Sequence, residues 1–132
     1  MMTNTFSDTG RMATVADWQV PSCLAKLAAL RPTQMCEMID AYIMDTTVRL
    51  ATIRAALRNN RLEVVSKEAH SMIGSSSQMG AGDLAQMLRT TEVAAKGGAA
   101  DAAGESVDAL MRSFAEISRS MTSYAARIRT PN

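Results

Sequence analysis

The sequence predicts an all-α protein: an antiparallel, up-down four-helix bundle with a short additional N-terminal helix. Apolar residues recur at positions i, i+3, i+4 and i+7 over long stretches, which is the pattern of amphipathic helices, and strand-like alternation is not found. The three prolines, Pro21, Pro32 and Pro131, leave the stretch 33–129 uninterrupted, so several long helices can form there. Short loops between four such helices favour antiparallel neighbours in a bundle.

Length and composition indicate a single domain and argue against several classes of protein. The 132 residues are enough for one hydrophobic core, and we divide the chain into a flexible N-terminal segment, 1–16, and a helical domain, 17–129. The net charge of +1 gives no general attraction to nucleic acid or to anionic membranes. No run of about 18 apolar residues is present, and the polar N-terminus lacks the apolar core of a signal peptide. Cys23 and Cys36 have neither CxxC spacing nor a nearby histidine, so we expect reduced thiols in a cytoplasmic protein without a metal site.

The first two helices are expected on either side of Pro32. A short helix follows Pro21, and its apolar side consists of Leu24, Leu27, Ala28 and Leu30. Thr33 can cap the next helix, which continues until Asn59 and Asn60 break the pattern. The apolar stripe of that helix consists of Met35, Met38, Ile39, Tyr42, Thr46, Leu50, Ile53 and Leu57.

Three further helices complete the predicted bundle. Asn60 and Glu63 have the spacing of a capping box, so a helix should start there and run to about Met79, where Gly80 can stop it in a left-handed conformation. The next helix ends by 97–98 and turns inward Leu84, Met87, Leu88 and Thr91. The last begins near Asp101, and its stripe consists of Val107, Leu110, Met111, Phe114, Ile117, Met121, Tyr124 and Ile128.

The only histidine of the chain, His70, is predicted to face solvent. At about 100° per residue, the apolar side of its helix consists of Leu62, Val65, Ala69, Met72 and Ser76. His70 lies roughly 120° from the centre of that side. It shares the opposite face with Glu63, Lys67, Gly74, Ser77 and, at the margin, Gln78. A single exposed histidine is often only a solvated side chain, so its position alone does not establish a function.

Gly74 is the second unusual feature of this face. It follows His70 by one turn, directly along the same side of the helix. A glycine within a helix costs about 1 kcal/mol relative to alanine, so its presence suggests that another molecule approaches closely here.

The stretch 69–81, AHSMIGSSSQMGA, followed by Leu84 and Glu92, resembles the signature of histidine phosphotransfer (HPt) domains. That signature reads A-H-x-L-K-G-S-S-x-x-x-G-A-x-x-L, with a glutamate further on. The preceding segment, 42–57, also resembles the helix that leads into the active helix of this family, and the similarity extends over about residues 20–125.

The resemblance implies a role for each residue around the histidine. His70 would accept the phosphoryl group, and Gly74 would leave space for the active-site loops of a receiver domain. Gln78, with Ser77 beside it, would be a polar neighbour able to hydrogen-bond the phosphoryl oxygens or the imidazole. Gly80 and Ala81 would form the turn between the paired helices.

The chain departs from the family pattern at Ile73, where a lysine is usual. In the family that lysine is thought to hold the negative charge of the phosphoryl group. Lys67, one turn before His70 on the same face, could partly replace it. Ile73 itself either joins a hydrophobic docking patch or lies at the edge of the core, and the sequence leaves both open.

The function implied is a phosphoryl carrier that relays the group between receiver domains of a hybrid histidine kinase and a response regulator. The carrier needs no cofactor of its own, because the receiver brings Mg²⁺ and most of the charge stabilisation. An HPt-like adaptor that binds a receiver or kinase without being phosphorylated is the alternative, and Ile73 favours it. A true enzyme is poorly supported, since a single histidine leaves no Cys/His pair, Ser/His/Asp set or metal-ligand spacing.

Overall fold

The computed structural model describes residues 18–129 of the chain, so the prediction for the segment 1–16 lies outside the described residues. The described residues are helical and contain no strand, which confirms the all-α fold. In chain order the helices are α2 (Ser22–Leu30), α3 (Pro32–Arg58), α4 (Leu62–Gln78), α5 (Gly82–Lys96) and α6 (Ala100–Arg129).

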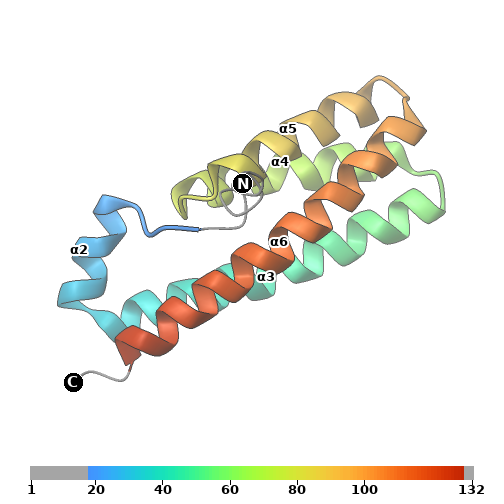
Figure 1. Cartoon of the computed structure of the whole chain (residues 1–132). Helices are drawn as coiled ribbons and strands as arrows, with labels where there is room; N and C mark the ends of the chain where they lie inside the picture. Colours follow the sequence, from blue (N-terminus) through green and yellow to red (C-terminus); the bar gives the residue numbers. More distant parts are fainter. Residues whose placement is uncertain (1–17, 130–132) are drawn as a thin grey trace, which may run out of the picture.

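Helices α3 to α6 form an antiparallel bundle in which successive helices are neighbours (Figure 1). Short connections after α3, α4 and α5 turn the chain back each time, as a bundle of this topology requires. The last helix returns beside the first of the four: the thiol of Cys36, near the start of α3, donates to the carbonyl of Ala125, near the end of α6, at 3.5 Å. The predicted four-helix bundle is therefore confirmed.

The segment that leads into α2 covers core residues that the two shorter helices of the bundle leave uncovered. Helices α3 and α6 have 27 and 30 residues, whereas α4 and α5 have only 17 and 15. At about 1.5 Å per residue, the longer pair extends well beyond the shorter one. The segment leading into α2 covers part of this overhang: the indole of Trp18 donates to the carbonyl of Met79 at 2.6 Å and packs edge-on against Tyr124.

The core contains the apolar stripes predicted from the sequence, with two exceptions. The largest side chains that are fully buried include Met35, Ile39, Ile53, Leu88, Leu110 and Met121. Leu30, expected on the apolar side of α2, is 80% exposed. It follows the buried Ala28 by two residues, which places it about 200° around the helix. Met38 of α3 is also at the surface, where the residue is 36% exposed.

Two predicted helix starts are wrong. Helix α3 begins at Pro32 rather than after Thr33, because a proline at the first position needs no hydrogen bond for its missing N–H. Asn60 does not cap α4: its φ of 56° completes the turn after α3, and Arg61 precedes the first residue of α4 without a side-chain cap. The residue whose backbone ends one helix cannot also take the extended conformation that starts the next.

The turn between α4 and α5 forms as predicted. Gly80 has a φ of 80°, a conformation that side chains disfavour, and the N–H of Ala81 reaches back to the carbonyl of Ser76 at 2.8 Å. A Cβ at Gly80 would lie only 2.6 Å from Cγ of Pro21. The glycine is therefore required twice, by the backbone conformation and by the close approach of the chain entering α2.

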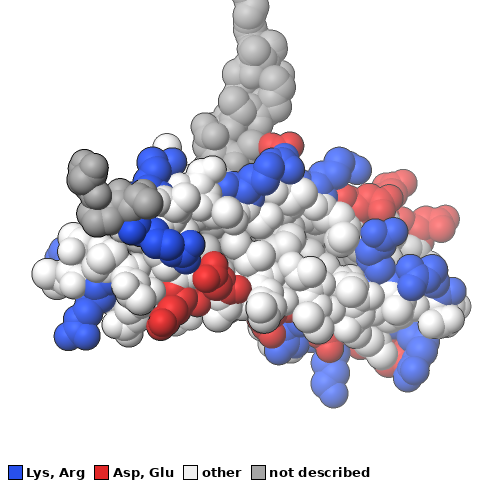
Figure 2. All heavy atoms as spheres, turned by 90° about the horizontal axis from the view of Figure 1, so that it is seen from below, with Lys and Arg blue, Asp and Glu red and all other residues white. Residues whose placement is uncertain are grey.

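The surface of the bundle mixes both signs of charge. On the face seen in Figure 2, lysine and arginine side chains are interspersed with aspartate and glutamate. None of the described helices is both long and apolar enough to cross a lipid bilayer.

Candidate functional site

His70 lies in the middle of α4 with its side chain turned out of the bundle. Its side chain is 72% exposed, whereas its neighbour Ala69 is completely buried. Consecutive residues of a helix point about 100° apart, and the apolar period of α4 decides which side packs into the core. Ala69 is on that side, and His70 is not. The exposed position predicted for the histidine is the one observed.

A carboxylate from the next helix holds the imidazole. Nδ1 of His70 lies 3.0 Å from Oε2 of Glu92 on α5, and Nζ of Lys96 lies 3.0 Å from the same oxygen. Only 13% of the Glu92 side chain is exposed, so the carboxylate sits between the two helices. The hydrogen bond from Lys96, and secondly that from His70, lowers the pKa of Glu92 below its ordinary value. The carboxyl group is therefore ionised at neutral pH.

This contact determines which ring nitrogen is free to react. A carboxylate accepts hydrogen bonds, so Nδ1 carries the proton that it donates to Glu92. In the neutral imidazole the lone pair is then on Nε2. Within the part of the chain that the structure describes, no group bonds to Nε2. The contact with Glu92 thus orients an exposed imidazole and favours the tautomer whose lone pair is on Nε2.

The face around His70 is open. A Cβ built on Gly74 would meet nothing within 4 Å, so packing within the bundle does not require a glycine there. The side chains of the neighbouring predicted residues Lys67, Ser77 and Gln78 are all exposed. The surface is thus accessible to a partner along more than two turns of α4.

Gln78 does not contact the imidazole. It lies eight residues from His70, which corresponds to about 12 Å along the helix axis. Glu92, rather than Gln78, is the residue that contacts the imidazole. Gln78 and Ser77 therefore remain candidates for contacts with a partner.

Ile73 is half-buried and packs against the hydrophobic core. This arrangement favours its interpretation as a residue at the edge of the core. Position 73 therefore carries no positive charge. Lys96 on α5 is linked to the imidazole, because both contact the same oxygen of Glu92.

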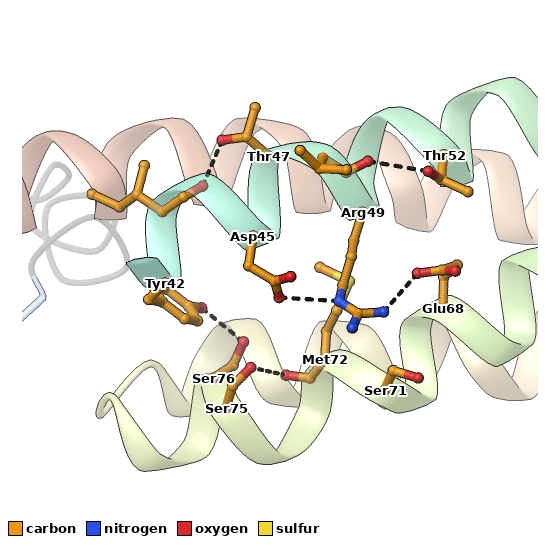
Figure 3. A network of polar contacts seen from close by, with 12 residues as sticks. Tyr42, Asp45, Thr47, Arg49, Thr52, Glu68, Ser71, Met72, Ser75 and Ser76 are labelled. Carbon is orange, nitrogen blue, oxygen red and sulfur yellow. Dashed lines mark hydrogen bonds and ion pairs between the residues drawn. The ribbon is translucent and has the colours of Figure 1, made fainter. Parts of the chain in front are cut away.

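The other flank of α4 is joined to α3 by a second polar network (Figure 3). The guanidinium of Arg49 lies 3.0 Å from Asp45 and 3.0 Å from Glu68, and the hydroxyl groups of Tyr42 and Ser76 are hydrogen-bonded at 2.7 Å. Burial raises the pKa of Tyr42, so its phenol stays protonated. These contacts fix α4 against α3 and leave the His70 face free.

Sequence reasoning assigned no role to Glu92 or Lys96. Glu92 was noted as part of a family pattern, and the i, i+4 spacing of the two residues indicates an ion pair on one side of α5. What could not be read from the sequence is the register of α5 against α4, which brings this pair beside His70. Among the described residues, no group of three histidine, cysteine, aspartate or glutamate side chains could hold a metal ion.

Fold and site together define a class: a helical bundle that presents an exposed histidine, held by a carboxylate, on its surface. The family model of the Hpt domain matches residues 37–121, more than half of the chain. The chain belongs to the Hpt domain family.

A solved structure agrees with this assignment. The crystal structure of the histidine-containing phosphotransfer protein B (HptB) from Pseudomonas aeruginosa PAO1 is similar with a TM-score of 0.74 and 27% sequence identity. The similarity covers 82% of this chain and 92% of that one. No match was found among curated proteins.

Proposed function

We propose that the protein is a phosphoryl carrier in which Nε2 of His70 receives a phosphoryl group from an aspartyl phosphate on a receiver domain. The observation that carries this proposal is the contact between Nδ1 of His70 and Glu92 at 3.0 Å, which in the neutral form of this exposed side chain leaves the lone pair on Nε2. The family assignment and the similarity to a histidine-containing phosphotransfer protein support it.

In the transfer, the lone pair of Nε2 attacks phosphorus while the bond to the aspartate oxygen breaks, and the aspartate leaves as a carboxylate with the bonding electrons. The ring becomes positively charged as the bond to Nε2 forms. The proton stays on Nδ1, where the carboxylate of Glu92 offsets this charge. The reverse reaction uses the same contacts, so the carrier can pass the group to a second receiver.

The partner supplies what the bundle lacks. We propose that Mg²⁺ and most of the charge stabilisation of the transition state come with the receiver, as is usual for phosphoryl transfer. The carrier contributes a positioned nucleophile and an open docking face along α4. A modest interface is expected, because a relay must release each partner.

The test measures transfer of an isotopically labelled phosphoryl group to wild type and to His70→Gln. The donor is a receiver domain charged with labelled acetyl phosphate. We expect base-stable, acid-labile label on wild type and none on His70→Gln. The variant should keep the far-ultraviolet circular dichroism of wild type, because the side chain is exposed. Label on His70→Gln would contradict the assignment of the acceptor.

An adaptor that binds a receiver without being phosphorylated is the second candidate, and the missing lysine at Ile73 favours it. Receiver binding to wild type and to His70→Gln with no label on either protein would support the adaptor. In that case Ile73→Lys is the first variant to test for a gain of transfer.

A further inference from the structure

The phosphoryl group on His70 needs a counter-charge that the usual position does not supply. Near neutral pH a phosphoryl group carries a charge of about −1.5 to −2. The positive charge of the phosphorylated ring is already paired with the ionised carboxylate of Glu92, so it offsets only part of the phosphoryl charge, and the two negative groups repel each other. Ile73 occupies the place of the usual lysine and packs against the core, so it cannot offset this charge.

The chain has three lysines, and they differ in their relation to His70. Lys26 lies on α2, a helix that packs on α3 rather than on α4. Lys67 precedes His70 by three residues, which turns it about 60° further from the α5 side of α4. Lys96 lies on α5, and its Nζ shares an oxygen of Glu92 with Nδ1 of His70, each at 3.0 Å. Nζ of Lys96 and Nδ1 of His70 are therefore close together, because both contact the same carboxylate oxygen.

We infer that the ammonium group of Lys96 is the counter-charge for the phosphoryl group on His70, supplied from α5 in place of a lysine at position 73. This inference rests on the proposed carrier function. An ammonium has three N–H donors, and the contact with Glu92 uses one of them. The side chain is 66% exposed, so it can turn toward the phosphoryl oxygens while keeping its contact with the carboxylate. Arg89, the other cation on this side of α5, contacts Gln86 at 3.4 Å instead.

The inference distinguishes a direct contact with the phosphoryl group from a purely structural role. If Lys96 only held Glu92 in place, its loss would alter the orientation of the imidazole and leave the ionisation of the phosphoryl group unchanged. A nearby cation stabilises the dianion, so it lowers the last pKa of the phosphoryl group. This pKa can be measured on the phosphorylated protein without a partner.

The experiment compares the three single variants Lys96→Met, Lys67→Met and Lys26→Met, each of which removes one positive charge. Each protein is phosphorylated with phosphoramidate, and the phosphohistidine signal is titrated by ³¹P NMR. The single-turnover rate of transfer is then measured from a receiver domain charged with acetyl phosphate. Lys26→Met is the matched control, because its charge is remote from the site.

We expect Lys96→Met to raise the pKa of the phosphoryl group and to slow transfer about tenfold, which corresponds to about 1.4 kcal/mol in the barrier. Lys96→Arg should retain both properties, and Ile73→Lys should restore them in the Lys96→Met background. A phosphoryl pKa equal to that of Lys26→Met, or a larger effect of Lys67→Met than of Lys96→Met, would overturn the inference and leave the carrier function intact. Absence of phosphohistidine on wild type would overturn both.

Discussion

The two flanks of α4 carry polar networks made of similar groups in opposite proportions. On the α3 flank, one cation, Arg49, lies 3.0 Å from two carboxylates, Asp45 and Glu68. On the α5 flank, one carboxylate, Glu92, lies 3.0 Å from two nitrogen groups, those of His70 and Lys96. Each network joins α4 to a neighbouring helix, but only the second contains a group that can act as a nucleophile near pH 7.

The difference shows how one helix can be held on both sides and still present exposed polar groups. The guanidinium of Arg49 is engaged on two sides and only 35% exposed, so it is committed to the contact between helices. On the other flank the carboxylate is nearly buried while the groups it binds, His70 and Lys96, are 72% and 66% exposed. The carboxylate of Glu92 holds both groups in position, and the rest of each side chain is exposed to solvent. If the proposed function is right, changes on the α3 flank should affect mainly stability, and changes on the α5 flank mainly transfer.

The largest effect is expected from removing the acid on the α5 flank. Glu92→Ala should slow phosphoryl transfer about 10- to 100-fold, because the imidazole loses the group that fixes its tautomer and orientation. Glu68→Ala, the matched change on the α3 flank, should leave the transfer rate close to that of wild type. Single-turnover transfer from a charged receiver measures both. Equal losses in the two variants would show that the flanks are not functionally distinct.

The second largest effect concerns stability on the α3 flank. Tyr42→Phe should lower the free energy of unfolding by about 1–2 kcal/mol, because the hydroxyl of Ser76 is completely buried and loses its partner. Urea denaturation measures the change, and transfer by the folded variant should be unaffected. The only other tyrosine, Tyr124, is half-buried and serves as the control: Tyr124→Phe should change stability by less than about 0.5 kcal/mol. Similar losses in both variants would argue against a specific role for the Tyr42 hydrogen bond.

Gly74 provides a test that separates stability from transfer, through two different substitutions. Gly74→Ala should raise the free energy of unfolding by about 0.5–1 kcal/mol, because the added methyl group meets no other atom and the unfolded chain loses freedom. Gly74→Arg should block receiver docking while the bundle stays folded. Gly104→Ala in α6, where a Cβ also meets open space, should stabilise without any effect on transfer. Unchanged transfer by folded Gly74→Arg would contradict docking on this face.

The smallest effect is in the titration of Glu92. The contacts with Lys96 and His70 lower its pKa in the folded protein from the ordinary value of 4.5, so the group contributes stability above that pH and loses it as the pH falls through the lowered pKa. NMR titration of the side-chain carboxyl carbon should give a midpoint below 4.5 in wild type and a higher one in Lys96→Met. A midpoint at or above 4.5 in wild type would contradict the ion pair.

The local features of the site could be predicted because they depend on helical geometry alone. The apolar period of α4 buries Val65, Ala69 and Met72, and it follows from this period that His70 must face outward. Gly80 could be recognised as the end of α4, since a left-handed residue is needed where the chain turns sharply. The resemblance to HPt domains added the role of His70, which the geometry alone does not name.

Other features were missed because they depend on competition between neighbouring elements. Asn60 has the side chain of a helix cap, yet the end of α3 takes its backbone into the left-handed region. Leu30 is apolar, but it lies about 200° around α2 from the buried Ala28, so packing of α2 on the bundle leaves it exposed. In both cases the local preference is worth about 1–2 kcal/mol, which packing or backbone closure can outweigh.

By itself, the sequence determined that the chain is a helical bundle with one exposed histidine beside an unexplained glycine. Only the tertiary structure decided that Glu92 and Lys96 are the groups at this histidine. The physical reason is that periodicity fixes the direction of a side chain around its own helix, whereas the partner it meets depends on how far two helices slide past each other. The core packing between α4 and α5 fixes that register, and with it the contact between Nδ1 of His70 and Glu92.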